Sequence, residues 1–196
     1  MAEVYRDLET IVEAILDQCR VLVSRREHVL ISIDGVGGSG KSALAASLAS
    51  ALGARVVSLD EYLDPHLGTY LPNLRYADIE GALRNAETSK MPFVIVEGLC
   101  VLSVLSRLGR EPDITVYIRR VGDDGEWMDQ FYYSEDNDLE EVLASLSHIE
   151  ARHPETPGIA DGDRELVRYH IETKPISAAR IVYDRRFESP ANEASA

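Results

Sequence analysis

Residues 35–42 read GVGGSGKS, a run in which four glycines precede a lysine and a serine. It lies between a mostly apolar, β-branched run at residues 28–34 and the helix-forming residues 42–49. This order predicts a buried strand, a tight turn and a helix. Because the strand is short and apolar, we expect both of its faces to be covered, as in the parallel sheets of α/β proteins.

The octapeptide also matches the pattern G-x-x-x-x-G-K-[S/T], which forms a phosphate-binding loop where it joins a strand to a helix. Backbone N–H groups turn inward around a phosphate there, and the helix presents its positive end. In such a loop Lys41 reaches the β- and γ-phosphates, and the Ser42 hydroxyl ligates Mg²⁺. A glycine turn with an incidental lysine is the alternative. The predicted nucleotide-binding residues are Gly35, Gly37, Gly38, Ser39, Gly40, Lys41 and Ser42.

Short apolar runs alternate with helix-forming runs along the rest of the chain. The predicted strands are residues 28–34, 55–59, 93–96, 114–118 and 180–183. The predicted helices are residues 3–26, 42–49, 78–87, 99–108 and 139–152. This alternation predicts an α/β fold, with a five-stranded parallel sheet and helices on both of its faces.

The composition excludes some classes of function. The chain has 34 acidic and 20 basic residues, a net charge of -14, which argues against a nucleic-acid partner because phosphates require basic patches. No apolar run approaches the ~20 residues that span a bilayer, so we expect no membrane partner. Cys19 and Cys100 lack metal-ligand spacing and are predicted to be buried thiols. We expect a cytoplasmic protein.

Acidic residues follow two of the predicted strands. Asp60 and Glu61 come after residues 55–59, and Glu97 comes after residues 93–96. Parallel α/β sheets bind their ligands at the carboxyl ends of the strands. There Asp60 could accept the proton of an attacking hydroxyl, and Glu97 could hold Mg²⁺ directly or through water. The alternatives are a capping or turn carboxylate for Asp60 and a solvated strand-end acid for Glu97.

Three segments carry a family resemblance: IDGVGGSGKS at 33–42, SLDEY at 58–62 and VIVEGL at 94–99. Taken in this order, they resemble the P-loop kinases of the uridine kinase, pantothenate kinase and phosphoribulokinase superfamily, most of all uridine kinase. YAD at 76–78, RR at 119–120 and HIETKP at 170–175 are similar as well. The resemblance thus covers about residues 28–184.

The resemblance implies a kinase that uses ATP and Mg²⁺ to phosphorylate a hydroxyl of a small metabolite. By position in the motifs, Asp60 would be the general base, Lys41 and Ser42 would hold phosphate and metal, and Glu97 would bind metal or substrate. Tyr62 and the loop that contains His66 would face the acceptor. Such a site works mainly by positioning groups and neutralising charge.

Residues 1–27 are predicted to be an N-terminal packing helix, residues 28–188 the kinase-like domain and residues 189–196 a flexible tail. Within the domain, residues 120–165 are a candidate lid or an insertion over the acceptor site. Arg119 and Arg120 are the candidates to neutralise the transferring phosphoryl group. They follow a strand directly, whereas relatives place a helix before an arginine-rich lid. The sequence also leaves open whether the N-terminal helix packs on its own sheet or on a second copy of the chain in a homo-oligomer.

The acidic segment 123–141 contains Trp127, Phe131, Tyr132 and Tyr133. One interpretation is a solvated surface segment. The other is an insertion whose aromatic rings stack on the acceptor and whose negative field favours a neutral or cationic substrate, such as a nucleoside.

The predicted function is therefore ATP-dependent phosphorylation of a nucleoside or a nucleoside-like compound. A GTPase switch is disfavoured because the chain has no Asn-Lys-x-Asp run. A non-catalytic, regulatory ATP-binding module stays open, since the lid is unclear and Arg180 stands where relatives have aspartate.

Overall fold

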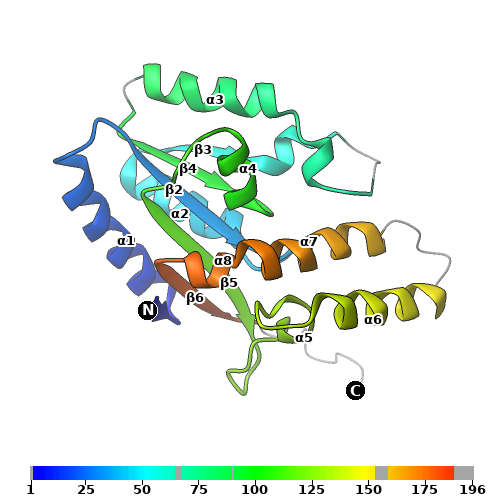
Figure 1. Ribbon diagram of the computed structural model, residues 1–196. Helices are drawn as coiled ribbons and strands as arrows, with labels where there is room; N and C mark the ends of the chain where they lie inside the picture. Colours follow the sequence, from blue (N-terminus) through cyan, green and yellow to red (C-terminus); the bar gives the residue numbers. More distant parts are fainter. Residues whose placement is uncertain (1, 65–67, 90, 153–158, 188–196) are drawn as a thin grey trace, which may run out of the picture.

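The computed structural model describes residues 2–64, 68–89, 91–152 and 159–187. Within these residues, the chain forms a six-stranded parallel sheet with the order β1-β6-β5-β2-β4-β3 (Figure 1). The strands are β1 (Glu3–Tyr5), β2 (Val29–Gly35), β3 (Arg55–Ser58), β4 (Phe93–Glu97), β5 (Ile114–Val121) and β6 (Ile181–Arg186). The α/β class and the parallel sheet agree with the sequence prediction.

The prediction of five strands is wrong, because β1 adds a sixth beside β6. Glu3 pairs with Ile181 and Tyr5 with Tyr183. The sequence predicts helix from residue 3, since Val4 and Leu8 are spaced as on one helix face. The helix begins only at Leu8, where the Asp7 carboxylate caps it by accepting a 2.9 Å hydrogen bond from the Thr10 N–H. A three-residue strand is too short to show an alternating pattern.

Helices cover both faces of the sheet, as Figure 1 shows. Side chains of α1 and α2 pack with one face, and those of α3 and α4 pack with the other. The eight helices in the described residues are α1 (Leu8–Val23), α2 (Lys41–Leu52), α3 (Tyr76–Thr88), α4 (Val101–Arg107), α5 (Gln130–Tyr133), α6 (Leu139–Arg152), α7 (Ile159–Thr173) and α8 (Pro175–Ala178). Two short 3₁₀ helices, η1 (Leu59–Tyr62) and η2 (Leu71–Asn73), lie between β3 and α3.

The segment between β5 and β6 folds into its own helical cluster, α5, α6 and α7, beside the sheet (Figure 1). Val142 and Leu146 of α6 pack against Val167 of α7 in a small apolar core. Tyr133 of α5 reaches α7, where its hydroxyl donates to the Asp163 carboxylate at 3.3 Å. Residues 120–165, predicted as a candidate lid or insertion, therefore include the end of β5, α5, α6 and the start of α7.

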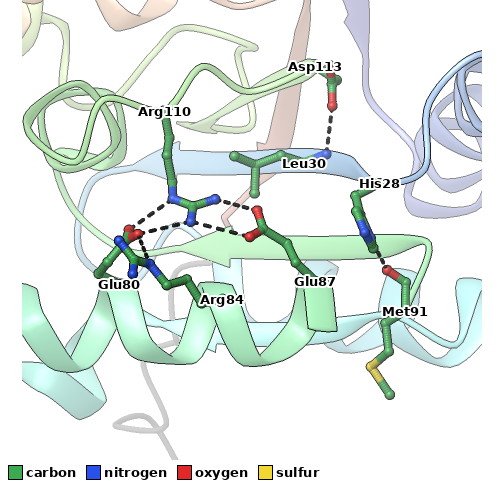
Figure 2. A network of polar contacts seen from close by, with 8 residues as sticks. All are labelled: His28, Leu30, Glu80, Arg84, Glu87, Met91, Arg110 and Asp113. Carbon is green, nitrogen blue, oxygen red and sulfur yellow. Dashed lines mark hydrogen bonds and ion pairs between the residues drawn. The ribbon is translucent and has the colours of Figure 1, made fainter. Parts of the chain in front are cut away.

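A network of ion pairs holds α3 to the segment that follows α4 (Figure 2). The Arg110 guanidinium binds the carboxylate of Glu80 at 3.0 Å and that of Glu87 at 2.5 Å. Nearby, the Asp113 carboxylate accepts a 2.8 Å hydrogen bond from the Leu30 N–H. Because Leu30 lies near the start of β2, this network fixes the end of the sheet opposite the glycine loop.

Cys19 and Cys100 are buried free thiols, as the sequence predicts. Among the described helices, none combines the length and the apolar character that a membrane crossing demands.

Candidate functional site

The glycine-rich loop joins the end of β2 to the start of α2, as the octapeptide predicts. Gly40 precedes α2 with a φ of +97°, in the left-handed region that favours glycine. Gly35 is required for space, because a Cβ there would lie 2.6 Å from the carbonyl oxygen of Ile118. A Cβ on Gly37 would meet no atom within 4 Å. The fold therefore demands glycine at Gly35 and Gly40 and not at Gly37.

Lys41, the first residue of α2, is nearly buried, with 8% of its surface exposed. Its Nζ donates a 2.8 Å hydrogen bond to the carbonyl oxygen of Val36, so the side chain folds back across the loop. Burial lowers the pKa of Lys41, while the carboxylates of Asp34, Glu97 and Asp60 raise it. Burial is the larger effect, so the pKa of Lys41 is lowered overall, and the three acids only offset part of that shift.

Glu97, the last residue of β4, brings together two hydroxyl groups. Its Oε1 accepts hydrogen bonds from the Oγ of Ser58 at 2.6 Å and from the Oγ of Ser42 at 3.2 Å. The Glu97 side chain is 2% exposed. One carboxylate and the Ser42 hydroxyl are hard oxygen donors of the kind that Mg²⁺ takes beside substrate phosphates. These residues therefore fit the predicted magnesium site.

Two further observations bear on that fit. The Oγ of Ser39, in the glycine loop, is buried without a hydrogen-bond partner. A buried hydroxyl without a partner indicates a polar ligand that the loop is shaped to hold. In the described ranges, no group of three or more His, Cys, Asp or Glu side chains could hold a metal ion.

Asp60 lies in η1, just beyond the end of β3, and its side chain is exposed. The Tyr70 hydroxyl donates to its Oδ1 at 2.8 Å. Tyr70 is itself held by α7, because the Glu165 carboxylate accepts the Tyr70 N–H at 2.5 Å and the Leu71 N–H at 3.1 Å. Burial and the Asp60 charge raise the pKa of Tyr70, so it stays a donor. This chain of contacts orients the carboxylate of Asp60.

Gly98 allows Tyr70 to reach Asp60. Its φ is +155°, and a Cβ there would lie 2.8 Å from the Leu59 Cβ and 3.0 Å from the Tyr70 hydroxyl. A larger residue would displace either η1 or Tyr70. This is the physical reason for a glycine after Glu97.

Asp34 is a functional candidate that the sequence analysis missed. Its Oδ1 accepts the Gly35 N–H at 2.7 Å, and its Oδ2 accepts the Val101 N–H at 3.1 Å and the Tyr169 hydroxyl. Burial raises the pKa of Asp34 to about 6, against these hydrogen bonds and the charge of Lys41. An acid inside an otherwise apolar strand was the available signal.

The two arginines that the sequence predicts for the site, Arg119 and Arg120, lie on opposite faces of β5. Successive side chains of a strand point to opposite faces. The Arg119 Nε donates to Asp184 at 2.7 Å, on the face opposite the glycine loop. The Arg120 Nε donates to Asp129 at 3.0 Å, and a Cβ on Gly38 would lie 3.7 Å from the Arg120 Nη1. The structure therefore brings Arg120, and not Arg119, to the loop.

The predicted acceptor residues are spread more widely. Tyr62 lines a groove of about 520 Å³ between α3 and the edge strand β3. Asp60 is not among the described residues that line it. Asp64 forms an ion pair with Arg75 at 2.8 Å. His66 lies outside the described residues.

The acidic segment 123–141 has both exposed and packed aromatic rings. Phe131 is 66% exposed and, with Trp127, lines a cavity of about 560 Å³ that also contains Glu126 and Glu141. The ring of Tyr133 lies 4.9 Å from that of His170 in α7. Part of this aromatic set therefore supports the helical cluster, and part lines an open cavity.

Neither a protein-family model nor a curated protein matches the sequence. Among solved structures, a possible uridine kinase from Bacillus stearothermophilus is similar, with a TM-score of 0.46 and 15% identity over 87% of this chain and 100% of the other. A eukaryotic dimethylallyltransferase that acts on tRNA has a TM-score of 0.31 and 15% identity, over 84% of this chain and 49% of its own. TT1252 from Thermus thermophilus has a TM-score of 0.32 and 17% identity, over 84% and 91%. The functional assignment therefore rests on the site itself.

Proposed function

We propose that the chain is an ATP-dependent kinase that transfers the γ-phosphoryl group to a hydroxyl of a small metabolite, a nucleoside or a nucleoside-like compound. The observation that carries the proposal is the placement of Asp60. It lies outside the glycine loop, is exposed and oriented by Tyr70, and acts electrostatically on Lys41. Binding alone does not require an oriented, exposed carboxylate at the carboxyl end of β3.

In the proposed reaction, the acceptor oxygen forms a bond to the γ-phosphorus and the bond to the β,γ-bridging oxygen breaks. The acceptor proton passes to the Asp60 carboxylate, and ADP leaves. Lys41 and the loop N–H groups hold the phosphates, and Arg120 adds a cation beside Gly38. Mg²⁺ at Ser42 and Glu97 would supply neutralisation of phosphate charge.

A neutral or cationic acceptor suits the charge of the molecule. The net charge is -14, and carboxylates of Glu126 and Glu141 line the cavity beside Trp127 and Phe131. An anionic acceptor would be repelled by such a surface. Aromatic rings favour a flat substrate, which supports a nucleoside over a simple sugar.

The test is acceptor-dependent release of ADP from Mg·ATP over a panel of nucleosides, pantothenate, ribosides and simple sugars. We expect turnover with a member of the nucleoside group. Asp60→Asn should abolish most of it and leave ATP affinity unchanged. Glu61→Gln is the matched control, since Glu61 is the adjacent exposed acid in η1.

If ATP binds and no acceptor raises the rate of ADP release, the proposed kinase activity is wrong. The chain is then a non-catalytic ATP-binding module. Equal turnover in Asp60→Asn and the wild type would instead remove Asp60 as the base.

A further inference from the structure

A second arginine lies beside Arg120 at the carboxyl end of the sheet. Arg185 of β6 is the register partner of Arg120 in β5. Two residues earlier in each strand, Ile118 and Tyr183 belong to the core that packs with α1 and α2. Because alternate residues of a strand share a face, Arg120 and Arg185 both extend from this face, where α2 begins at Lys41.

Arg185 lies across the glycine loop. Its Nη1 is 3.5 Å from the carbonyl oxygen of Gly38. A Cβ on Gly40 would lie 2.6 Å from the same Nη1 and 3.0 Å from the Arg185 Cδ. The Arg185 side chain thus fills the space where a Cβ of residue 40 would lie. This space is directly before the first turn of α2.

Arg185 differs from the neighbouring arginines in its ion pairing. Arg119 is paired with Asp184, and Arg120 is paired with Asp129. Among the described residues, no carboxylate lies within ion-pair distance of Arg185, and its hydrogen bond is to a neutral carbonyl. Within the described ranges the Arg185 guanidinium therefore has a neutral partner and no anionic one, although the chain has 34 acidic and 20 basic residues.

We propose that Arg185 binds the phosphate chain of the nucleotide, as a third cation beside Lys41 and Arg120. This inference rests on the proposed nucleotide-binding function and adds a residue that the motif does not include. A planar guanidinium donates in parallel to phosphate oxygens, which suits it to this position better than an ammonium. Since it acts on phosphates and not on the base, its contribution is independent of the base.

The experiment measures binding of ATP, GTP and inorganic tripolyphosphate by calorimetry, to the full chain and to Arg185→Gln. We expect affinity for ATP and tripolyphosphate to fall about 10-fold or more. The factor should be similar for every triphosphate that binds. Adenosine, which has no phosphate, should show no difference between the two proteins.

Arg186→Gln is the matched control, because Arg186 is the next residue of β6 and its side chain makes an exposed contact of 3.9 Å with Asp123. Its affinities should equal those of the wild type. Arg185→Lys keeps the charge and loses the planar fork, so we expect an intermediate affinity. It also serves if Arg185→Gln does not fold.

The outcomes separate this proposal from the proposed function. If the wild type binds ATP and both Arg185 variants bind it equally well, Arg185 is only a support for the loop and the proposal is wrong. The same holds if the variants lower thermal stability alone. If the wild type binds neither ATP nor tripolyphosphate, the proposed function is wrong, and the role proposed for Arg185 is wrong as well.

Discussion

The hydroxyl of Tyr70 donates a 2.8 Å hydrogen bond to Oδ1 of Asp60. Tyr70 is 7% exposed, so its ring is fixed, whereas Asp60 is exposed on a short 3₁₀ helix. The tyrosine therefore limits the rotation of the Asp60 side chain, and within the described residues no hydrogen bond occupies its Oδ2, the oxygen that would act as the base in the proposed reaction. The two carboxylate oxygens of Asp60 therefore differ: Oδ1 accepts the hydrogen bond from Tyr70, and Oδ2 does not.

We expect Tyr70→Phe to lower kcat for ADP release about 10-fold, because a hydrogen bond to a charged group is lost. The affinity for ATP should not change, since the hydrogen bonds of Tyr70 in the described ranges go to Asp60 and Glu165 and not to the glycine loop. Steady-state kinetics with the acceptor found in the panel would measure both. Tyr5→Phe, which removes a hydroxyl bonded to Glu3 at 2.7 Å, is the control. Unchanged kcat in Tyr70→Phe would contradict the positioning role.

Gly98→Ala should destabilise the fold by about 2 kcal/mol or more, because it combines a φ of +155° with contacts of 2.8 Å and 3.0 Å. Chemical denaturation would measure the loss. Gly81→Ala is a matched control within α3, where a Cβ would meet nothing within 4 Å. That change should stabilise by about 0.5–1 kcal/mol. Similar effects of the two substitutions would be evidence against the tight approach of Tyr70.

Glu165→Ala should lower kcat as well, through Tyr70. The substitution removes the acceptor for the N–H groups of Tyr70 and Leu71, which loosens the segment that carries the Tyr70 hydroxyl. Glu172→Ala, at an exposed position of the same helix, should leave kcat unchanged. A double variant with Tyr70→Phe tests the pathway, because the two losses should not add. Fully additive losses would show that Glu165 acts elsewhere.

The ion pairs of α3 predict that the free energy of unfolding falls as the pH is lowered. Arg110 first, and then Arg84, lower the pKa of Glu80 from 4.5 to about 2. Because the pKa in the folded state is below that in the unfolded state, ionised Glu80 stabilises the fold above about pH 4.5. That contribution is lost as the pH falls toward about 2.

Urea denaturation between pH 6 and pH 2 would measure this, with pH values chosen to bracket about 4.5 and about 2. The free energy of unfolding should fall less steeply with acid in Glu80→Gln than in the wild type. Glu13→Gln, at an exposed position of α1, should follow the wild-type curve. Parallel curves for Glu80→Gln and the wild type would contradict the role of Glu80.

Local patterns predict much of this fold. The glycine loop, β2 and α2 follow from residues adjacent in sequence, and α6 has the predicted bounds of 139–152. Asp60 and Glu97 were found because parallel strands end at one edge of the sheet. These inferences need no knowledge of contacts between distant segments.

The missed features depend on such contacts. Tyr70 meets Glu165, and Asp34 meets Tyr169, across 95 and 135 residues. Helix α7, which supplies both partners, was not predicted. Arg119 and Arg120 were treated as a pair because β5 was expected to end at residue 118. It continues to Val121, so the alternation of the strand sends them to opposite faces.

The pairing of β1 with β6 also bears on the order in which the sheet assembles. Glu3 and its register partner Ile181 lie near opposite ends of the described residues. Contacts of such separation form late, because closing a long loop costs entropy before the pairing gains anything. Until that pairing forms, no strand covers the outer edge of β6, the strand that carries Arg185.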